Sequence, residues 1–342
     1  MMQEPLRTNI YKVAELAHVS AMTVTRAFNG SAPVAEKTKA RILKIAAELG
    51  YHPNIMAQSL RSGKTNSIGL LCSLSGPHDS VGLIRNISIR LMNKGYACHI
   101  ADSLSDPEII KQCLINFSSR NIDGVIIELN ELLSKNNEVL DLLRKIPNVI
   151  IMTPELLDID FDILTVDRTQ AIREIVDCFA ASGRKKIVFM GGMDDRRQHA
   201  FLEQVKFHHL PCSDHSIIFL DNYNKEEKEE DKWNYFVNTF KDKFKRKAYP
   251  DAIICSTDEG AAAMINYFQE KGYNVPQDIA VVGFNNSAMA LYLRPPLASV
   301  ERRNMDVGKS VTNMLLNRIK NPSSPPQHKI LEMKFIHRQS AG

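Results

Sequence analysis

Nine short apolar runs, each followed by a longer amphipathic stretch, constrain the fold of most of this chain. They cover residues 68–72, 97–101, 124–127, 149–152, 164–166, 187–190, 217–220, 253–255 and 280–284. Strands that alternate with helices in this way predict parallel sheets covered by helices on both faces. Nine strands are many for one sheet, and the triplets at 94–96 and 271–273 repeat the same Lys-Gly-Tyr helix end. We therefore expect two similar α/β lobes, with a cleft between the carboxyl ends of their strands.

The first 66 residues follow a helical period instead. Asn9 is a candidate N-cap for a first helix, and Ser20 is a candidate N-cap for a second helix that ends at Asn29–Gly30. A third helix is expected over 36–49, before Gly50. We predict a small all-α module over 1–61, a linker over 62–67 and a two-lobed α/β domain over 68–342.

Positive charge is concentrated in this first module. Residues 1–66 carry nine Lys and Arg side chains against four acidic ones, although the whole chain has a formal net charge of only +4. Such an asymmetry favours an anionic partner for the module. The alternative on charge alone is an ordinary solvated helical surface.

Other function classes find little support in the sequence. No apolar run approaches the roughly 20 residues that cross a bilayer, and the first residues do not form a secretory signal. The six cysteines include no CxxC pair, which favours reduced thiols and a cytoplasmic location. Signatures of serine hydrolases, zinc proteases, P-loops and Rossmann folds are missing, so we expect neither an enzyme nor a cofactor. The cluster His208, His209, Cys212 and His215 has suitable metal ligands but no finger spacing, and we predict no metal site.

A helix, a three-residue turn and a second helix form the geometry that places a helix in the DNA major groove. Residues 9–30 closely resemble the headpiece of the lac repressor/galactose repressor (LacI/GalR) family. The resemblance continues through Val34, Thr38, residues 49–54, Ala57, Ser59 and Leu60. From residue 68 onward the chain resembles the effector domain of that family, which is itself similar to sugar-binding periplasmic proteins. Its marks are residues 123–127, 191–192, 275–284 and 295–297.

The resemblance and the helix geometry together suggest DNA contacts. Ala21 and Met22 occupy the base-reading positions, and Arg26, one turn further on, can make a bidentate contact to guanine. Side chains that suit phosphate contacts are Asn9, Tyr11, Ser20, Thr23, Thr25, Asn29 and Thr38. For Tyr11 and Thr38, packing or capping is the alternative.

Residues 54–61 resemble the hinge helix of the family, which enters the minor groove as a symmetric pair. This implies DNA contacts for Asn54 and Ala57, and a wedge at Leu60 that kinks the duplex. Eight residues are too few for a stable isolated helix, so we expect this segment to fold on DNA. The alternative interpretation, a disordered linker, describes the same segment in the absence of DNA.

The resemblance also implies effector contacts. Arg197, which lies between the Gly-Gly pair and Ala200–Phe201, is the first candidate, with a solvent-facing arginine as the alternative. Further candidates are Tyr223, Asp258, Asn285 and Arg302. Asn285 and Met152 stand where the family usually carries acids, and Arg302 stands where glutamine is common. We therefore expect a more positive cleft that favours a sugar acid or sugar phosphate, while a degenerate pocket without an effector stays open.

These observations predict a homodimeric transcriptional regulator, most simply a repressor, that binds near-palindromic DNA and responds to a sugar-like effector. A leucine heptad tail like that of the lac repressor is missing, which favours a dimer over a tetramer. A sugar-binding solute receptor without DNA function is the alternative. An enzyme on an α/β scaffold is the third hypothesis.

Overall fold

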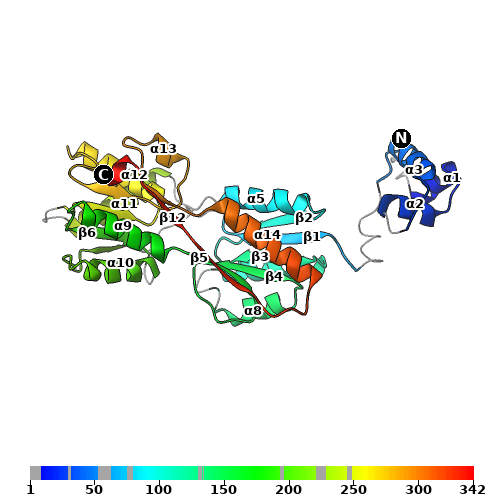
Figure 1. Cartoon of the computed structure of the whole chain (residues 1–342), viewed down its shortest axis with the longest axis horizontal. Helices are drawn as coiled ribbons and strands as arrows, with labels where there is room; N and C mark the ends of the chain where they lie inside the picture. The colour runs from blue at the N-terminus through cyan, green and yellow to red at the C-terminus, as the bar shows by residue number, and fades with distance from the viewer. Residues whose placement is uncertain are drawn as a thin grey trace. The chain divides into compact units, whose positions relative to one another are not determined.

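The structure is a computed structural model that describes residues 9–29, 32–52, 63–74, 80–129, 133, 135–192, 196–220, 229–244 and 249–342. The chain divides into two compact units, Met1–Thr65 and Asn66–Gly342. Figure 1 labels their helices and strands. Each unit is described by itself.

The first unit, the headpiece, holds helices α1 (Ile10–Leu16), α2 (Ala21–Asn29) and α3 (Glu36–Glu48). The predicted caps form, because the side chain of Asn9 accepts a hydrogen bond from the Lys12 N–H at 3.1 Å and Ser20 Oγ accepts one from the Thr23 N–H at 3.1 Å. After α3, Gly50 adopts a φ of +60°, the left-handed conformation that ends many helices. Side chains from all three helices form one small core, in which the fully buried members are Val13, Ala17, Val24 and Ile42.

The second unit contains two lobes. The sheet of the first, the N-lobe, has the strand order β11-β5-β4-β3-β1-β2, and every pair is parallel. Its strands are β1 (Ser67–Cys72), β2 (Ala97–Asp102), β3 (Gly124–Glu128), β4 (Val149–Thr153), β5 (Asp162–Asp167) and β11 (His328–Glu332). Alternate residues face opposite sides, and the apolar runs of β1, β3, β4 and β5 are buried on both faces, whereas the edge strand β2 is only partly buried.

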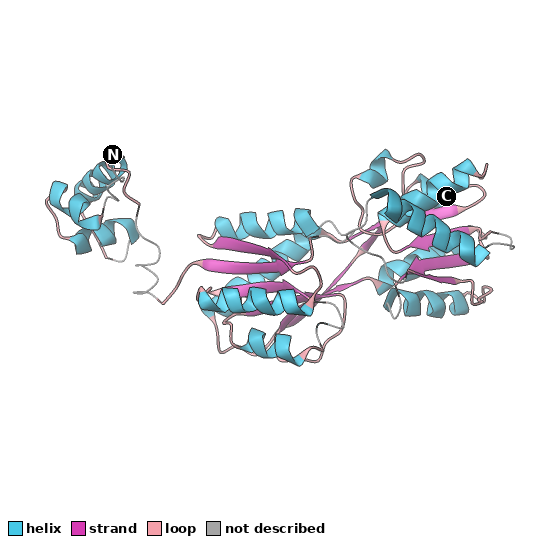
Figure 2. Cartoon of the chain, turned by 180° about the vertical axis from the view of Figure 1, so that it is seen from behind, coloured by secondary structure: helices cyan, strands magenta, loops and turns pink. Residues whose placement is uncertain are grey.

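Helices cover both faces of this sheet, as Figure 2 shows. On one face lie α5 (Ser80–Met92) and α14 (Asn304–Lys320), which pack side by side. On the other lie α6 (Pro107–Ser119) and α8 (Asn137–Arg144). An added Cβ at Gly308 of α14 would lie 2.2 Å from Asn86 Oδ1, so a larger residue there would force the Asn86 side chain of α5 to move.

The sheet of the second lobe, the C-lobe, has the parallel order β7-β6-β8-β9. Its strands are β6 (Ile187–Gly191), β7 (Ile217–Phe219), β8 (Ala252–Cys255) and β9 (Ala280–Val282). Helices α9 (Thr169–Ala181) and α10 (Arg196–Phe207) cover one face, and α11 (Glu229–Phe244) and α12 (Asp258–Glu270) cover the other. A short helix, α13 (Met289–Tyr292), follows β9. The carboxyl ends of the strands therefore share one edge in each lobe.

Crossing segments join the two lobes. The chain passes from β5 to α9 near Asp167, whose Oδ1 accepts a hydrogen bond from the Thr169 N–H at 3.0 Å. Strands β10 (Ser299–Glu301) and β12 (Lys334–Ile336) form an antiparallel pair and belong to the other two segments that connect the lobes. The chain ends with the turn η1 (Gln339–Ala341). The Met333 N–H donates to the Asp167 carbonyl at 2.9 Å, which joins two of these crossings.

All nine predicted strands form, and the α/β architecture with helices on both faces is confirmed. Three further strands, β10, β11 and β12, were not predicted from the sequence. The first and last have three residues each, and β11 lies at the sheet edge with mostly exposed side chains, so none of them produces an apolar run. Within the described residues, no helix is long and apolar enough to span a bilayer.

Candidate functional site

The second helix of the headpiece divides into a buried and an exposed face. Val24 and Ala27 enter the core, whereas Met22 is 49% exposed and Arg26 is also exposed. Ala21 is half-buried, and its carbonyl accepts a hydrogen bond from Thr25 Oγ1 at 3.1 Å. The side chains predicted to read bases therefore lie on one small rigid helix, with Met22 and Arg26 turned outward.

The predicted phosphate contacts lie around the start of the same helix. Ser20 and Thr23 share a hydroxyl–hydroxyl hydrogen bond of 2.9 Å at its N-terminus, where backbone N–H groups favour anions. Tyr11 is 72% exposed, so the packing alternative for this side chain is wrong. Thr38 is half-buried in the first turn of α3, and Asn29 is the last residue of α2. Asn54, Ala57 and Leu60 lie outside the described residues, as does the predicted effector residue Tyr223.

Two cations on the described part of the headpiece have acidic partners. Lys12 pairs with Glu15 at 3.0 Å, and Lys44 approaches Glu48 at 3.9 Å. Among the described residues, Arg26 forms no ion pair with an acidic side chain. No ion pair with a described acidic side chain has to be broken before its planar guanidinium makes a bidentate contact.

In the second unit, Arg197 is a buried arginine at the carboxyl edge of the C-lobe sheet. It projects from α10, is only 6% exposed, and donates from Nη1 to the Ser256 carbonyl at 3.0 Å. Its guanidinium carbon lies 4.9 Å from the centre of the Phe284 ring. The alternative of a solvent-facing arginine is therefore wrong, and Arg197 connects the segments that follow β8 and β9.

Asn285 lies next to this arrangement in an uncommon backbone conformation. It is buried with a φ of +98°, and its N–H donates to the Val300 carbonyl at 2.9 Å. Asn286 also has a positive φ, of +49°, and its Oδ1 accepts a hydrogen bond from Arg338 Nη2 at 2.6 Å. Left-handed non-glycine residues cost about 1–3 kcal/mol each and occur at ligand sites more often than elsewhere.

The structure places Asp258 inside the C-lobe, at the first position of α12. It is fully buried; its Oδ1 accepts from Ser299 Oγ at 2.5 Å and its Oδ2 from the Ser287 N–H at 2.6 Å. Burial raises the pKa of the Asp258 carboxyl above its ordinary value. The hydrogen bonds from Ser299 and Ser287 oppose this shift, but burial has the larger effect. The carboxylate thus positions the loop after β9.

Arg302 requires a correction, which concerns charge. The sequence predicted a positive charge without a nearby acid, but Arg302 Nη2 donates to Glu128 Oε1 at 2.6 Å and both side chains are largely buried. Glu128 ends β3 and lies in register beside Met152 on β4. The acid expected at Met152 is therefore supplied by the neighbouring strand. Only the strand register could have indicated Glu128.

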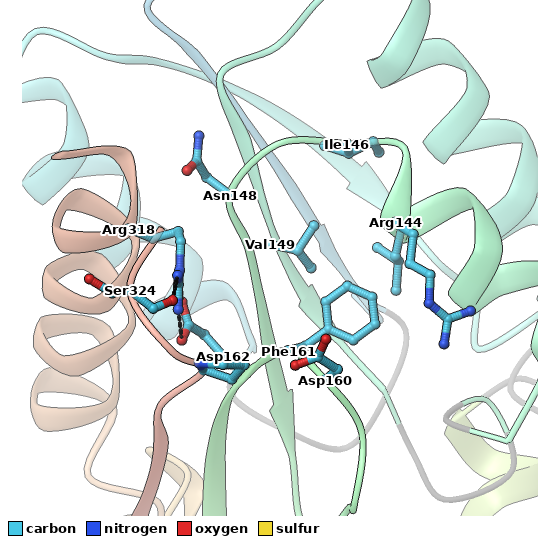
Figure 3. Close-up of a pocket in the computed structure, with 11 residues that line it drawn as sticks. Arg144, Ile146, Asn148, Val149, Asp160, Phe161, Asp162, Arg318 and Ser324 are labelled. Carbon is cyan, nitrogen blue, oxygen red and sulfur yellow. Dashed lines mark hydrogen bonds and ion pairs between the residues drawn. The ribbon is translucent and has the colours of Figure 1, made fainter. Parts of the chain in front are cut away.

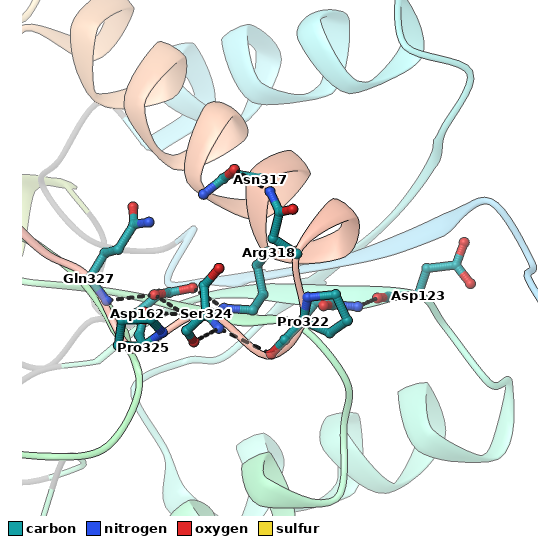
Figure 4. A network of polar contacts seen from close by, with 10 residues as sticks. Asp123, Asp162, Asn317, Arg318, Pro322, Ser324, Pro325 and Gln327 are labelled. Atoms are coloured by element: carbon teal, nitrogen blue, oxygen red, sulfur yellow. Dashed lines mark hydrogen bonds and ion pairs between the residues drawn. The ribbon is translucent and has the colours of Figure 1, made fainter.

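A pocket of about 330 Å³ lies at the opposite, amino edge of the N-lobe sheet. Figure 3 shows Val149 and Phe161 in this pocket, with the Arg318–Asp162 pair at one side. Arg318 donates to both oxygens of Asp162, at 2.7 and 2.8 Å, and to the carbonyls of Pro322 and Pro325 at 3.2 and 3.0 Å (Figure 4). These bonds hold the segment between α14 and β11. The pocket is therefore not the predicted interlobe cleft.

The four candidate metal ligands follow α10 in the chain. His208 pairs with Asp177 at 2.5 Å. In the part of the chain that the structure describes, no group of three or more His, Cys, Asp or Glu side chains is placed to hold a metal ion.

A capped helix-turn-helix headpiece joined to a two-lobed α/β unit defines the class of transcriptional regulators with a periplasmic-binding-protein-like domain. Residues 9–54 match the bacterial regulatory proteins of the lacI family, and residues 176–341 match a periplasmic binding protein-like domain. The chain is 30% identical to catabolite control protein A of Staphylococcus xylosus, over 89% of this chain and 90% of that protein. It belongs to the LacI family, and it is a DNA-binding transcriptional regulator.

Other relatives agree with this assignment. The transcriptional repressor PurR of Klebsiella pneumoniae is 27% identical over 97% of this chain and 96% of its own length. The fold is similar to that of a lac repressor dimer bound to operator and the anti-inducer ONPF, with a TM-score of 0.81 and 20% identity over 98% and 99% of the two chains. A complex of the regulator CelR with cellobiose has a TM-score of 0.68 at 20% identity, and it covers 98% and 100% of the chains. These relatives are transcriptional regulators and not enzymes.

Proposed function

We propose that this chain is a homodimeric repressor that binds a near-palindromic operator through α2 of each subunit. The observation that carries the proposal is the outward placement of Met22 and Arg26 on a helix whose other face is anchored in the headpiece core. One such helix buries too little surface for tight recognition, so two copies related by a two-fold axis are needed. Acting on DNA places the protein in the cytoplasm.

An exposed apolar stripe on the N-lobe supports the dimer. Val81, Ile89 and Met92 lie on the outer face of α5, and all three are exposed. Ile100, on the neighbouring edge strand β2, is exposed as well. Exposed apolar groups of this kind mark protein contacts, and in a two-fold dimer the same patch serves both subunits.

A small sugar-like effector, neutral or acidic, is the proposed regulator of DNA binding. It would contact Arg197, Asn285 and Arg302, which lie at the edges where the strands of the lobes end or in the crossing segments. The CelR–cellobiose complex supports a sugar for this class of protein. Closure of the lobes around the effector would reposition the paired 54–61 segments and change operator affinity, typically by about 1–3 kcal/mol of coupling.

The test is selection of binding sites from a random DNA pool by the purified full-length chain. The proposal expects enrichment of a sequence with two inverted half-sites. Enrichment of single, unpaired half-sites, or of no sequence above the input pool, would rule out a dimeric operator-binding protein. Light scattering on the enriched complex then counts the bound subunits, and two are expected.

A further inference from the structure

The Glu128–Arg302 pair lies where several strands of the N-lobe end. Glu128 is the last residue of β3, and Cys72 and Asp102 are paired residues at the ends of β1 and β2. Arg302 directly follows β10, in the segment that crosses into α14. One hydrogen-bonded ion pair therefore connects the carboxyl edge of the N-lobe sheet to a crossing segment.

The hydrogen bonds of Arg302 are incomplete. Its side chain is 7% exposed, and its Nη2 is held by Glu128. Nε and Nη1 are buried and have no hydrogen-bond partner among the described residues, and the same is true of Ser73 Oγ, which directly follows β1. Buried donors left unsatisfied are costly, so these atoms suit an incoming oxygen acceptor.

The charge of the pair decides which acceptor fits. The carboxylate of Glu128 neutralises the guanidinium of Arg302. Because both side chains are largely buried, solvent weakens the attraction between the two charges only a little. A ligand carboxylate or phosphate at Nε and Nη1 would make a buried cluster with a net negative charge, which is unfavourable. An uncharged hydroxyl or carbonyl oxygen would satisfy the same donors without this cost.

We propose that Glu128 is a specificity-determining residue of the effector site, an inference that rests on the proposed function. It makes the subsite formed by Nε and Nη1 of Arg302 reject anions and accept uncharged oxygen groups. This inference reverses the expectation of an anionic sugar at this end of the site. It also assigns a role to a residue that neither the helix and strand pattern nor the resemblance indicated. Removal of the Glu128 charge should convert the subsite into an anion site.

Inorganic phosphate tests this proposal without knowledge of the natural effector. Binding is measured by calorimetry on the full-length wild-type chain, Glu128→Gln, Arg302→Gln and the double variant. Asp177→Asn removes the same single charge from an exposed residue of α9 that contacts Gln204 and His208, and it serves as the matched control. We expect Glu128→Gln to bind phosphate at least about tenfold more tightly than wild type, the double variant to lose this gain, and Asp177→Asn to match wild type.

Two results would overturn the proposal. The first is equal phosphate affinity of wild type and Glu128→Gln, with both chains folded by circular dichroism. The second, which does not depend on the folding of Glu128→Gln, is weaker phosphate binding by Arg302→Gln than by wild type, because Arg302 would then already bind anions. Operator binding is measured separately. A negative phosphate result would therefore not affect the proposed DNA-binding function, and a failure to bind operator would not affect the subsite assignment.

Discussion

The guanidinium of Arg197 lies 4.9 Å from the centre of the Phe284 ring and donates to the carbonyl of Ser256. The ring and the carbonyl together fix the plane of the guanidinium at the carboxyl edge of the C-lobe sheet. A buried arginine that is held in this orientation loses little further entropy when a ligand oxygen binds at its guanidinium. This geometry supports Arg197 as the principal effector contact.

Arg197→Ala should therefore weaken effector binding at least about tenfold, since hydrogen bonds from a charged donor contribute about 1.5–3 kcal/mol. Thermal shift with matched neutral and acidic sugars identifies a ligand of the wild-type chain, and calorimetry compares its affinity for the variant. Arg144→Ala, on the exposed end of α8, is the control. Unchanged affinity in Arg197→Ala would remove this residue from the site.

Gly283→Ala should destabilise the C-lobe. An added Cβ would lie 2.4 Å from Asp258 Oδ1 and 3.0 Å from Leu297 Cδ2, and neither group can move freely in the core. The expected loss is about 1–3 kcal/mol in the free energy of unfolding, measured with urea. Gly192→Ala is a matched control, because no heavy atom lies within 4 Å of its added Cβ. Similar losses for the two variants would contradict the packing described around Asp258.

The buried carboxyl of Asp258 predicts a pH dependence of stability. Burial raises the pKa of this carboxyl in the folded state. At a pH between its unfolded and folded pKa values, the folded chain therefore binds more protons than the unfolded chain does. Its contribution to the free energy of unfolding is complete below the unfolded pKa, about 3.9, and is lost as pH rises through the folded pKa. Asp258→Asn cannot titrate. Urea unfolding at a series of pH values should show wild type losing stability relative to this variant as pH rises; a constant difference would contradict the raised pKa.

Met92→Glu should dissociate the proposed dimer. The substitution places two acidic groups, one from each subunit, on the exposed apolar stripe of α5, and like charges in an apolar contact weaken association. Sedimentation should show a dissociation constant raised at least about tenfold. Ile115→Glu, on the exposed surface of α6, changes a similarly exposed apolar residue outside the stripe and should leave the constant unchanged. Equal effects of the two substitutions would argue against this interface.

The sequence predicted those features that local chemistry determines. Asn9 and Ser20 cap helices as expected because the capping side chain and its N–H partner are three residues apart. Buried strands such as β3 and β4 appear as apolar runs because helices cover both faces. In contrast, β11 is an edge strand of mostly exposed residues, and its position depends on Arg318 and Asp162, which are 156 residues apart.

The candidate site was harder to predict for the same reason. Glu128 and Arg302 are separated by 174 residues, so neither indicates the other in the sequence. The burial of Asp258 depends on Ser299 and Ser287, which belong to later segments. Family resemblance indicated which positions matter, but the charge balance at those positions follows from the three-dimensional register.

The central claim, that α2 reads base pairs in DNA, is tested most directly by Arg26→Ala. Affinities of wild type, Arg26→Ala and the control Arg144→Ala are measured by fluorescence anisotropy on the selected operator, on every single-base-pair variant of its half-site, and on random DNA. We expect wild type and Arg144→Ala to lose about 1–3 kcal/mol of binding free energy when one particular base pair is changed in each half-site. Arg26→Ala should lose this preference at that base pair alone. An equal loss of affinity by Arg26→Ala for operator and random DNA, with the base-pair preferences of wild type retained, would contradict the central claim.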